Sequence, residues 1–101
     1  MITVYPAIFH EEDGVFWVEF PDLEGCQTCG NTLREAMEQA QEALGLYIAT
    51  LEESDIKIPN ASDIKKIRAP ENSFVSLVSC DVGKYRRKTG AVKKTLTLTK
   101  E

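Results

Sequence analysis

Hydrophobic residues repeat with two different periods in this chain, and the first change of period lies at Thr32. Before Thr32, apolar and polar side chains alternate over short runs, which is typical of half-buried β-strands. After it, apolar side chains recur every third or fourth position over roughly 20 residues, which predicts one amphipathic α-helix. A single helix can bury its apolar stripe only against another element. The sequence therefore predicts a two-layer α+β domain in which one long helix covers a small sheet.

Three short strands are predicted before the change of period: residues 2–10, residues 15–20 and residues 26–29. The run Glu11-Glu12-Asp13-Gly14 predicts a turn in which Gly14 can take a positive φ, so the first two strands form an antiparallel hairpin, and the third completes a meander. Side chains alternate across a strand, which places Phe16, Val18 and Phe20 on one face and Trp17 on the other. Because Pro6 cannot donate a ladder hydrogen bond, we expect the first strand to lie at a sheet edge or to be locally bulged.

The helix is predicted to begin at a capping box, in which Thr32 and Glu35 satisfy free backbone N–H groups. Gly45 lies inside the helix at a cost of about 1 kcal/mol relative to alanine, which suggests that another group packs close to it. The expected buried stripe comprises Leu33, Met37, Ala40, Leu44, Tyr47 and Leu51.

Residues 54–72 are polar and contain two prolines, which indicates a surface excursion. Residues 73–82 have strand character again and are expected to return to the sheet beside the meander. Residues 84–91 are interpreted as a hinge, and residues 92–99 as one last alternating strand. We therefore expect a binding domain over residues 1–83, a hinge over 84–91 and the start of a second module over 92–101.

The length of 101 residues corresponds to about one domain, too small for a deep active site. No apolar run approaches the roughly 18 residues that span a bilayer, and the N-terminus lacks the basic start of a signal peptide, so we expect a cytoplasmic protein. The odd number of cysteines argues against a disulfide framework. Cys26, Cys29 and Cys80 are expected to be free, at least partly buried thiols.

The charge is distributed unevenly along the chain. Residues 1–83 contain 5 Lys/Arg and 15 Asp/Glu, a net of −10, whereas residues 84–101 contain 7 Lys/Arg and 1 Asp/Glu, a net of +6. Such asymmetry indicates either two partners of opposite charge or a tail that meets nucleic acid while the body does not. A basic tail that is merely solvated is the alternative.

The order of these elements, together with several short motifs, resembles the HicB antitoxin family over about residues 3–82. The run Phe20-Pro21-Asp22-Leu23-Glu24-Gly25-Cys26 is the most specific of these motifs. The others are Tyr5-Pro6-Ala7-Ile8-Phe9, Asp13-Gly14, Trp17-Val18-Glu19, Gly30-Asn31-Thr32-Leu33, Glu35-Ala36 and Glu42-Ala43-Leu44.

The resemblance implies a partial RNase H-like fold that has lost nuclease function, so no enzymatic activity and no cofactor are expected. It also implies a partner, a small basic HicA-type toxin that cleaves mRNA, which such antitoxins sequester. A C-terminal domain in this family represses the operon. A stand-alone binding module of the same fold, without a toxin partner, is the first alternative, and a small metal-dependent nuclease is the second.

The tail fits this resemblance, because residues 92–98 look like the first strand of a ribbon–helix–helix module. In such modules the strands of two chains pair and enter the major groove, which would bring Lys93, Thr95 and Thr97 to DNA. Thr99 stands where the family commonly has proline, and the two helices of the module do not follow. We therefore expect specific operator binding only if a C-terminal continuation exists.

Four residues are expected to meet the toxin: Trp17, Glu19, Asp22 and Glu24. Carboxylates need only complementarity of charge to hold a basic protein, and an aromatic residue on an open sheet face is a typical interface anchor. Trp17 could instead pack beneath the helix or under residues 54–72. Open sheet edges and exposed aromatic surface also favour a homodimer.

Three other features could point to a catalytic or metal-binding site, but the residues around them do not predict one. Cys26-x-x-Cys29 resembles a metal or redox motif, yet residues three apart on a strand point to opposite faces. His10 is the sole histidine and has no nucleophile at a recognisable spacing. A nuclease would need Glu19, Asp22 and Asp81 to converge on Mg²⁺, which their spacing does not predict. We therefore predict no catalytic and no metal-binding residue.

Overall fold

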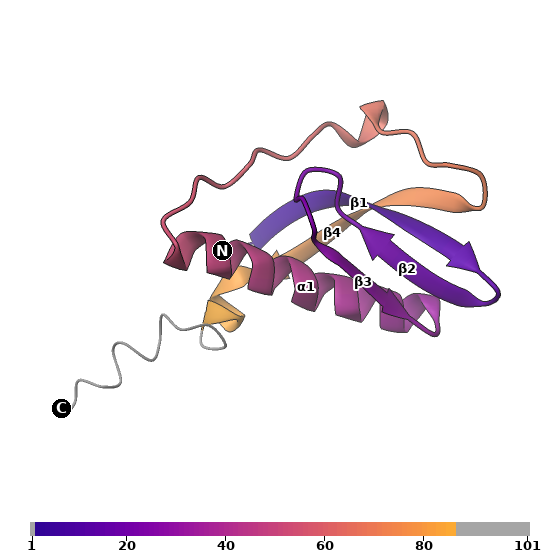
Figure 1. The fold of residues 1–101 in the computed structure, drawn as a ribbon, viewed down its shortest axis with the longest axis horizontal. Coiled ribbons are helices and arrows are strands. Elements are labelled where there is room, and N and C mark those ends of the chain that lie inside the picture. Colours follow the sequence, from indigo (N-terminus) through magenta and orange to yellow (C-terminus); the bar gives the residue numbers. More distant parts are fainter. Residues whose placement is uncertain (1, 87–101) are drawn as a thin grey trace.

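The computed structural model describes residues 2–86, which form one antiparallel sheet and one long helix (Figure 1). The predicted α+β, two-layer architecture is confirmed. The sheet has the order β3-β2-β1-β4, and the helix covers one of its faces. The elements in chain order are β1 (Ile2–Glu12), β2 (Val15–Glu19), β3 (Gln27–Gly30), α1 (Leu33–Glu53), the 3₁₀ turn η1 (Ile64–Lys66), β4 (Ser73–Asp81) and the 3₁₀ turn η2 (Val82–Lys84).

The β1–β2 hairpin is closed by a two-residue turn, Asp13-Gly14, which is shorter than the predicted turn over residues 11–14 because Glu11 and Glu12 still belong to β1. Asp13 has φ 55° and Gly14 has φ 80°, and a turn with positive φ at both central residues matches the twist of the two strands. This turn sets the register of the hairpin, in which His10 lies opposite Trp17. The backbone of this loop thus decides which side chains become neighbours on the sheet.

The expectation for Pro6 is wrong, because β1 lies inside the sheet and its pairing with β4 is unbroken from Ile2 to His10. Proline is tolerated because β2 pairs with β1 only from Ile8 to Glu12. At Pro6 the side of β1 that faces β2 therefore has no strand beside it. An internal strand can carry a proline where one neighbouring strand has already ended.

The helix begins as predicted, with Thr32 as its N-cap. The Thr32 hydroxyl accepts a hydrogen bond from the Glu35 N–H at 3.0 Å, and the Glu35 carboxylate accepts one from the Asn31 N–H at 2.6 Å. Gly30 lets β3 approach this first turn, because an added Cβ would lie 2.5 Å from the Ala36 nitrogen. The close contact fixes where α1 starts relative to the sheet.

The core lies between α1 and one face of the sheet. From the helix it receives Ala36, Ala40, Leu44, Ile48 and Ala49; from the sheet it receives Tyr5, Ala7, Phe9, Val18 and Val78. The buried stripe is slightly rotated from the predicted one, since Leu33 is 48% exposed. Among residues 2–86, no helix is long and apolar enough to cross a membrane.

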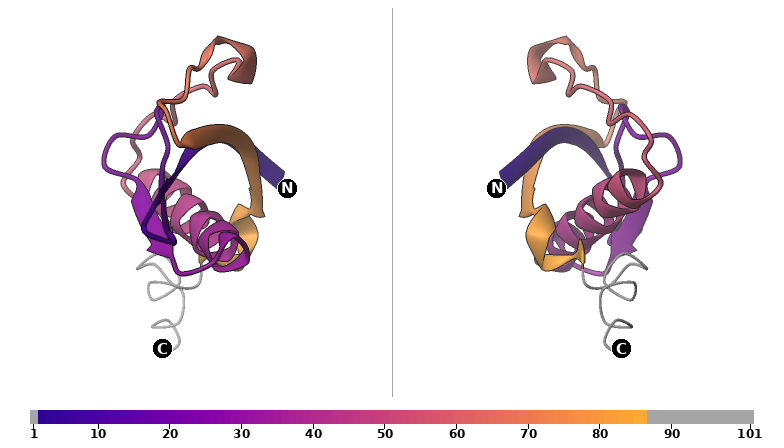
Figure 2. Two further views of the ribbon diagram at one scale, coloured as in Figure 1. Left: turned by 90° about the vertical axis from the view of Figure 1, so that its right-hand side faces the viewer. Right: turned by 90° about the vertical axis from the view of Figure 1, so that its left-hand side faces the viewer.

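The excursion over residues 54–72 crosses from the end of α1 to the start of β4 (Figure 1). Two contacts hold it to the body: the Tyr5 hydroxyl donates to the Pro59 carbonyl, and Ser62 donates to both carboxylate oxygens of Asp22. Figure 2 shows that the sheet curves around α1 and that η1 lies on the opposite side of the sheet. This long connection is therefore fastened to the sheet.

Candidate functional site

Trp17 lies on the sheet face that α1 leaves uncovered, which we call the open face. Its neighbour Val18 is fully buried under the helix, whereas Trp17 is 36% exposed. Two further apolar residues of the open face, Val4 and Leu77, are 43% and 51% exposed. Trp17 therefore does not pack beneath the helix; it lies partly exposed at the end of the open face, near Glu71 and Asn72 of the excursion.

Trp17 belongs to a small cluster with His10 and Glu19. The His10 and Trp17 rings are stacked, with centroids 3.8 Å apart and planes 10° from parallel. The His10 Nε2 lies 2.7 Å from a Glu19 carboxylate oxygen, and the His10 side chain is only 15% exposed. The indole is thus fixed by the imidazole, which the carboxylate fixes in turn. An aromatic side chain held in this way loses little freedom when a partner covers it.

An acidic hollow adjoins the stacked rings. It has a volume of about 300 Å³ and is lined by His10, Trp17, Glu11, Glu12, Glu71 and Asn72. The strand residues come from β1 and β2, and the last two from the end of the excursion. Three exposed carboxylates beside an aromatic ring give this end of the open face the negative charge that a lysine- or arginine-rich surface complements.

The structure brings Trp17 and Glu19 together but places Asp22 and Glu24 elsewhere, in the β2–β3 turn. The Asp22 carboxylate accepts hydrogen bonds from the Ser62 N–H and hydroxyl at 2.9 and 2.5 Å. The Glu24 backbone carbonyl accepts a hydrogen bond from the Tyr47 hydroxyl at 2.8 Å, and the Glu24 side chain is exposed. Asp22 therefore has a structural contact that the sequence did not predict.

The three carboxylates considered for a nuclease lie in separate contacts. Glu19 binds His10, Asp22 binds Ser62, and the Asp81 side chain accepts a hydrogen bond from the Gly83 N–H at the end of β4. Within residues 2–86, no three His, Cys, Asp or Glu side chains gather closely enough to hold a metal ion. The described part of the chain thus offers no carboxylate set for metal-assisted hydrolysis.

The cysteines are free thiols with different surroundings. Cys26 and Cys80 are buried, whereas Cys29 is exposed, so the expectation of burial is wrong for Cys29. Burial raises the pKa of the Cys26 thiol to about 11, and burial together with Asp81 raises the pKa of Cys80. Cys26 and Cys29 point to different environments, as the strand spacing predicted.

His10 is the functional candidate that sequence reasoning underrated. Its position in a strand agrees with the prediction for residues 2–10, and in the structure it lies within β1 opposite Trp17. The signal was present, because a two-residue turn at 13 and 14 places residue 10 across from residue 17. The predicted DNA-contacting residues Lys93, Thr95 and Thr97 lie outside the described residues.

The sequence is similar to a known family over nearly its full length. The family model for the HicB_like antitoxin of bacterial toxin-antitoxin systems matches residues 5–100. An uncharacterized 14.9 kDa protein from the rep-hol intergenic region of Haemophilus phage HP1 is 33% identical over 82 residues, which is 78% of this chain and 62% of the phage protein. The chain thus spans about three fifths of the length of this relative.

Solved structures share the fold. A toxin–antitoxin complex from Streptococcus pneumoniae contains a chain that is 34% identical, with a TM-score of 0.79 over 84% of this chain and 73% of that chain. The N-terminal domain of the Burkholderia pseudomallei antitoxin HicB is 25% identical, with a TM-score of 0.65 over 78% of this chain and 99% of that domain. The fold described above is therefore that of an antitoxin N-terminal domain.

Proposed function

We propose an antitoxin function for this chain, because the chain belongs to the HicB-like antitoxin family of bacterial toxin–antitoxin systems. In this proposal residues 1–83 bind a small basic HicA-type toxin in the cytoplasm and cover the surface with which it cleaves RNA. The family match carries the proposal. It is supported by the net charge of −10 over these residues, which complements a basic partner.

The open face is the proposed contact surface. It presents Trp17 in a fixed orientation beside the acidic hollow, and it also exposes the apolar side chains of Val4 and Leu77 farther along the sheet. In many protein interfaces, an aromatic side chain that becomes buried provides affinity, and the charged residues around it provide specificity. Covering the toxin in this way requires only that the two surfaces match in shape and charge, and no chemical step by the antitoxin.

The test is an RNA protection assay with a HicA-type toxin. We expect that adding the chain suppresses cleavage of labelled RNA in proportion to its molar ratio, and that higher salt slows association because the attraction is electrostatic. The control is the chain alone, with and without Mg²⁺. Unchanged cleavage by the toxin at excess chain would contradict the proposal. Mg²⁺-dependent cleavage by the chain alone, abolished by Asp22→Asn, would favour a nuclease instead.

We also propose that basic side chains of residues 84–101 other than Arg86 contact nucleic-acid phosphates. The proposal is supported by the net charge of +6 over residues 84–101. Each phosphate contact adds a slope of about −0.9 to the dependence of log affinity on log salt concentration. Replacing Lys93 and Lys94 with glutamine should therefore flatten the slope by about 2, measured by fluorescence anisotropy with duplex DNA. The matched control replaces Lys65 and Lys66 of η1; an equal effect of this pair would show that the tail is not the contact.

A further inference from the structure

The last described residues do not leave the domain at the end of β4 but pack on α1. Tyr85 lies against Gly45: a Cβ added at Gly45 would be 2.2 Å from the Tyr85 Cδ2 and 2.7 Å from its Cγ. These are ring atoms close to the backbone, so the ring could not yield without leaving its place. Gly45 therefore forms a notch in the helix that Tyr85 fills, which explains a glycine inside an otherwise regular helix.

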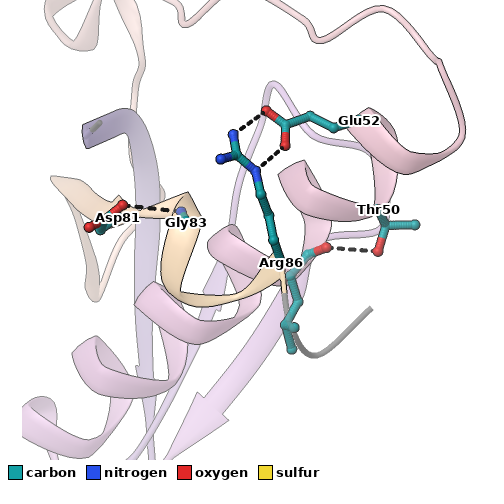
Figure 3. Close-up of polar contacts among 6 residues, drawn as sticks. Thr50, Glu52, Asp81, Gly83 and Arg86 are labelled. Carbon is teal, nitrogen blue, oxygen red and sulfur yellow. Dashed lines mark hydrogen bonds and ion pairs between the residues drawn. The ribbon is translucent and has the colours of Figure 1, made fainter. Parts of the chain in front are cut away.

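Arg86 adds a second contact to the same helix. Its guanidinium donates two hydrogen bonds to the Glu52 carboxylate, at 2.9 and 3.1 Å (Figure 3). Glu52 lies seven residues after Gly45, which is two helical turns, so both contacts are on one side of α1. The hydrogen bonds from Arg86 lower the pKa of Glu52 below its ordinary value. Paired hydrogen bonds to a carboxylate fix the orientation of the arginine.

The path from β4 to these contacts is also fixed. The Asp81 side chain accepts a hydrogen bond from the Gly83 N–H at 3.1 Å, and the Tyr85 N–H donates to the Val82 carbonyl at 2.9 Å. Val82 is 4% exposed and belongs to the core. The turn η2 thus redirects the chain from the sheet onto the helix and delivers Tyr85 to the Gly45 notch.

We propose that Tyr85 and Arg86 form a latch on α1 that fixes the point from which the basic C-terminal tail departs. The chain then belongs to the body up to Arg86, which includes the first three residues of the predicted hinge over 84–91. Residues 87–91 can span at most about 18 Å when fully extended. If the tail contacts DNA, as proposed above, the latch holds the acidic body within that reach of the DNA-contacting strand. The distance between body and DNA rests on the proposed function, whereas the contacts of Tyr85 and Arg86 with α1 do not.

The test of the notch is a double-mutant cycle between Gly45 and Tyr85. Alanine is the better helix former, so Gly45→Ala should raise the melting temperature by several degrees in a Tyr85→Ala background. In the wild-type background the new methyl group must displace the Tyr85 ring, so the same change should lower the melting temperature. This reversal of sign is the expected result. An equal increase in both backgrounds would show that Tyr85 does not occupy the notch.

A second measurement addresses the tail directly. In the wild-type chain, the ¹H–¹⁵N heteronuclear NOE values of residues 84–86 should equal those of α1. The substitutions Gly45→Ala and Glu52→Gln should each lower the NOE values of residues 84–86. The resonances of the sheet should stay unchanged in both variants. The matched control is Glu38→Gln, which removes the exposed Arg34–Glu38 pair of the same helix. Low NOE values of residues 84–86 in the wild-type chain, or no response to either variant, would overturn the latch.

The latch should also respond to acid. Because Arg86 lowers the folded-state pKa of Glu52, the ion pair is complete above the ordinary carboxyl range near about 4.3 and is lost as the pH falls through the lowered value. Asp81 also acts on Arg86 and raises its pKa. The NOE loss on acidification should be smaller in Glu52→Gln than in the wild type. These readouts need neither toxin nor DNA, so failure of the antitoxin proposal would leave them unchanged.

Discussion

Leu44→Ala should lower the free energy of unfolding by roughly 2–5 kcal/mol, which is a large part of the total for a domain of this size. Leu44 is fully buried at the centre of α1, where the core residues of the sheet pack on the helix. Truncating its side chain removes buried apolar surface and leaves a cavity between helix and sheet that the surrounding side chains can fill only in part. The measurement is the midpoint of urea unfolding at constant slope.

The control for this prediction is Leu33→Ala in the same helix. Leu33 is 48% exposed, so its truncation should change the free energy of unfolding by no more than about 0.5 kcal/mol. Both variants introduce the same residue into the same helix, and the difference between them reports burial alone. Equal effects would show that α1 does not pack on the sheet through Leu44.

Trp17→Ala should weaken toxin binding by about 30-fold or more, which corresponds to roughly 2 kcal/mol. The reason is that Trp17 is partly exposed on the open face yet held in place by His10, so that burying it in an interface costs little conformational entropy. The measurement is isothermal titration calorimetry with the toxin. The melting temperature of the free chain should change little, because a partly exposed side chain supports little of the core.

The control for the open face is Ile56→Ala. Ile56 is 55% exposed and lies in the excursion, so it offers a comparable apolar surface outside the proposed contact. Glu19→Gln should give an intermediate loss, since it weakens the hydrogen bond that orients His10 without removing the aromatic anchor. Full affinity of Trp17→Ala would place the toxin on another surface.

Much of the fold could be predicted because local patterns decide it. The change of period at Thr32 separates sheet from helix, and the Asp13-Gly14 turn specifies the hairpin. The Thr32–Glu35 hydrogen bond marks the start of α1. Each of these signals lies within a few residues of its effect, so no knowledge of tertiary contacts was needed.

The remaining features depend on contacts between residues far apart in the sequence. The partner of Asp22 is 40 residues away, at Ser62, and no local pattern announces it. Gly45 did indicate a close neighbour, but nothing in the sequence identified Tyr85. Pro6 led to a wrong expectation because the rule about proline concerns a hydrogen bond on one side of a strand, and the sequence did not reveal that β2 ends before reaching it.

The position of β1 in the sheet has a consequence for synthesis on the ribosome. Among residues 2–86, β1 is synthesised before the other strands, and β4, which pairs with it over nine residues, is synthesised after them. Until Asp81 has emerged, β1 has only the five-residue pairing with β2, and the apolar side chains of both sheet faces lack their neighbours. Closure of the sheet must therefore wait for almost the whole domain to be translated. A nascent chain that stops before β4 would therefore hold only the β1–β2–β3 part of the sheet, with the side of β1 that pairs with β4 left open.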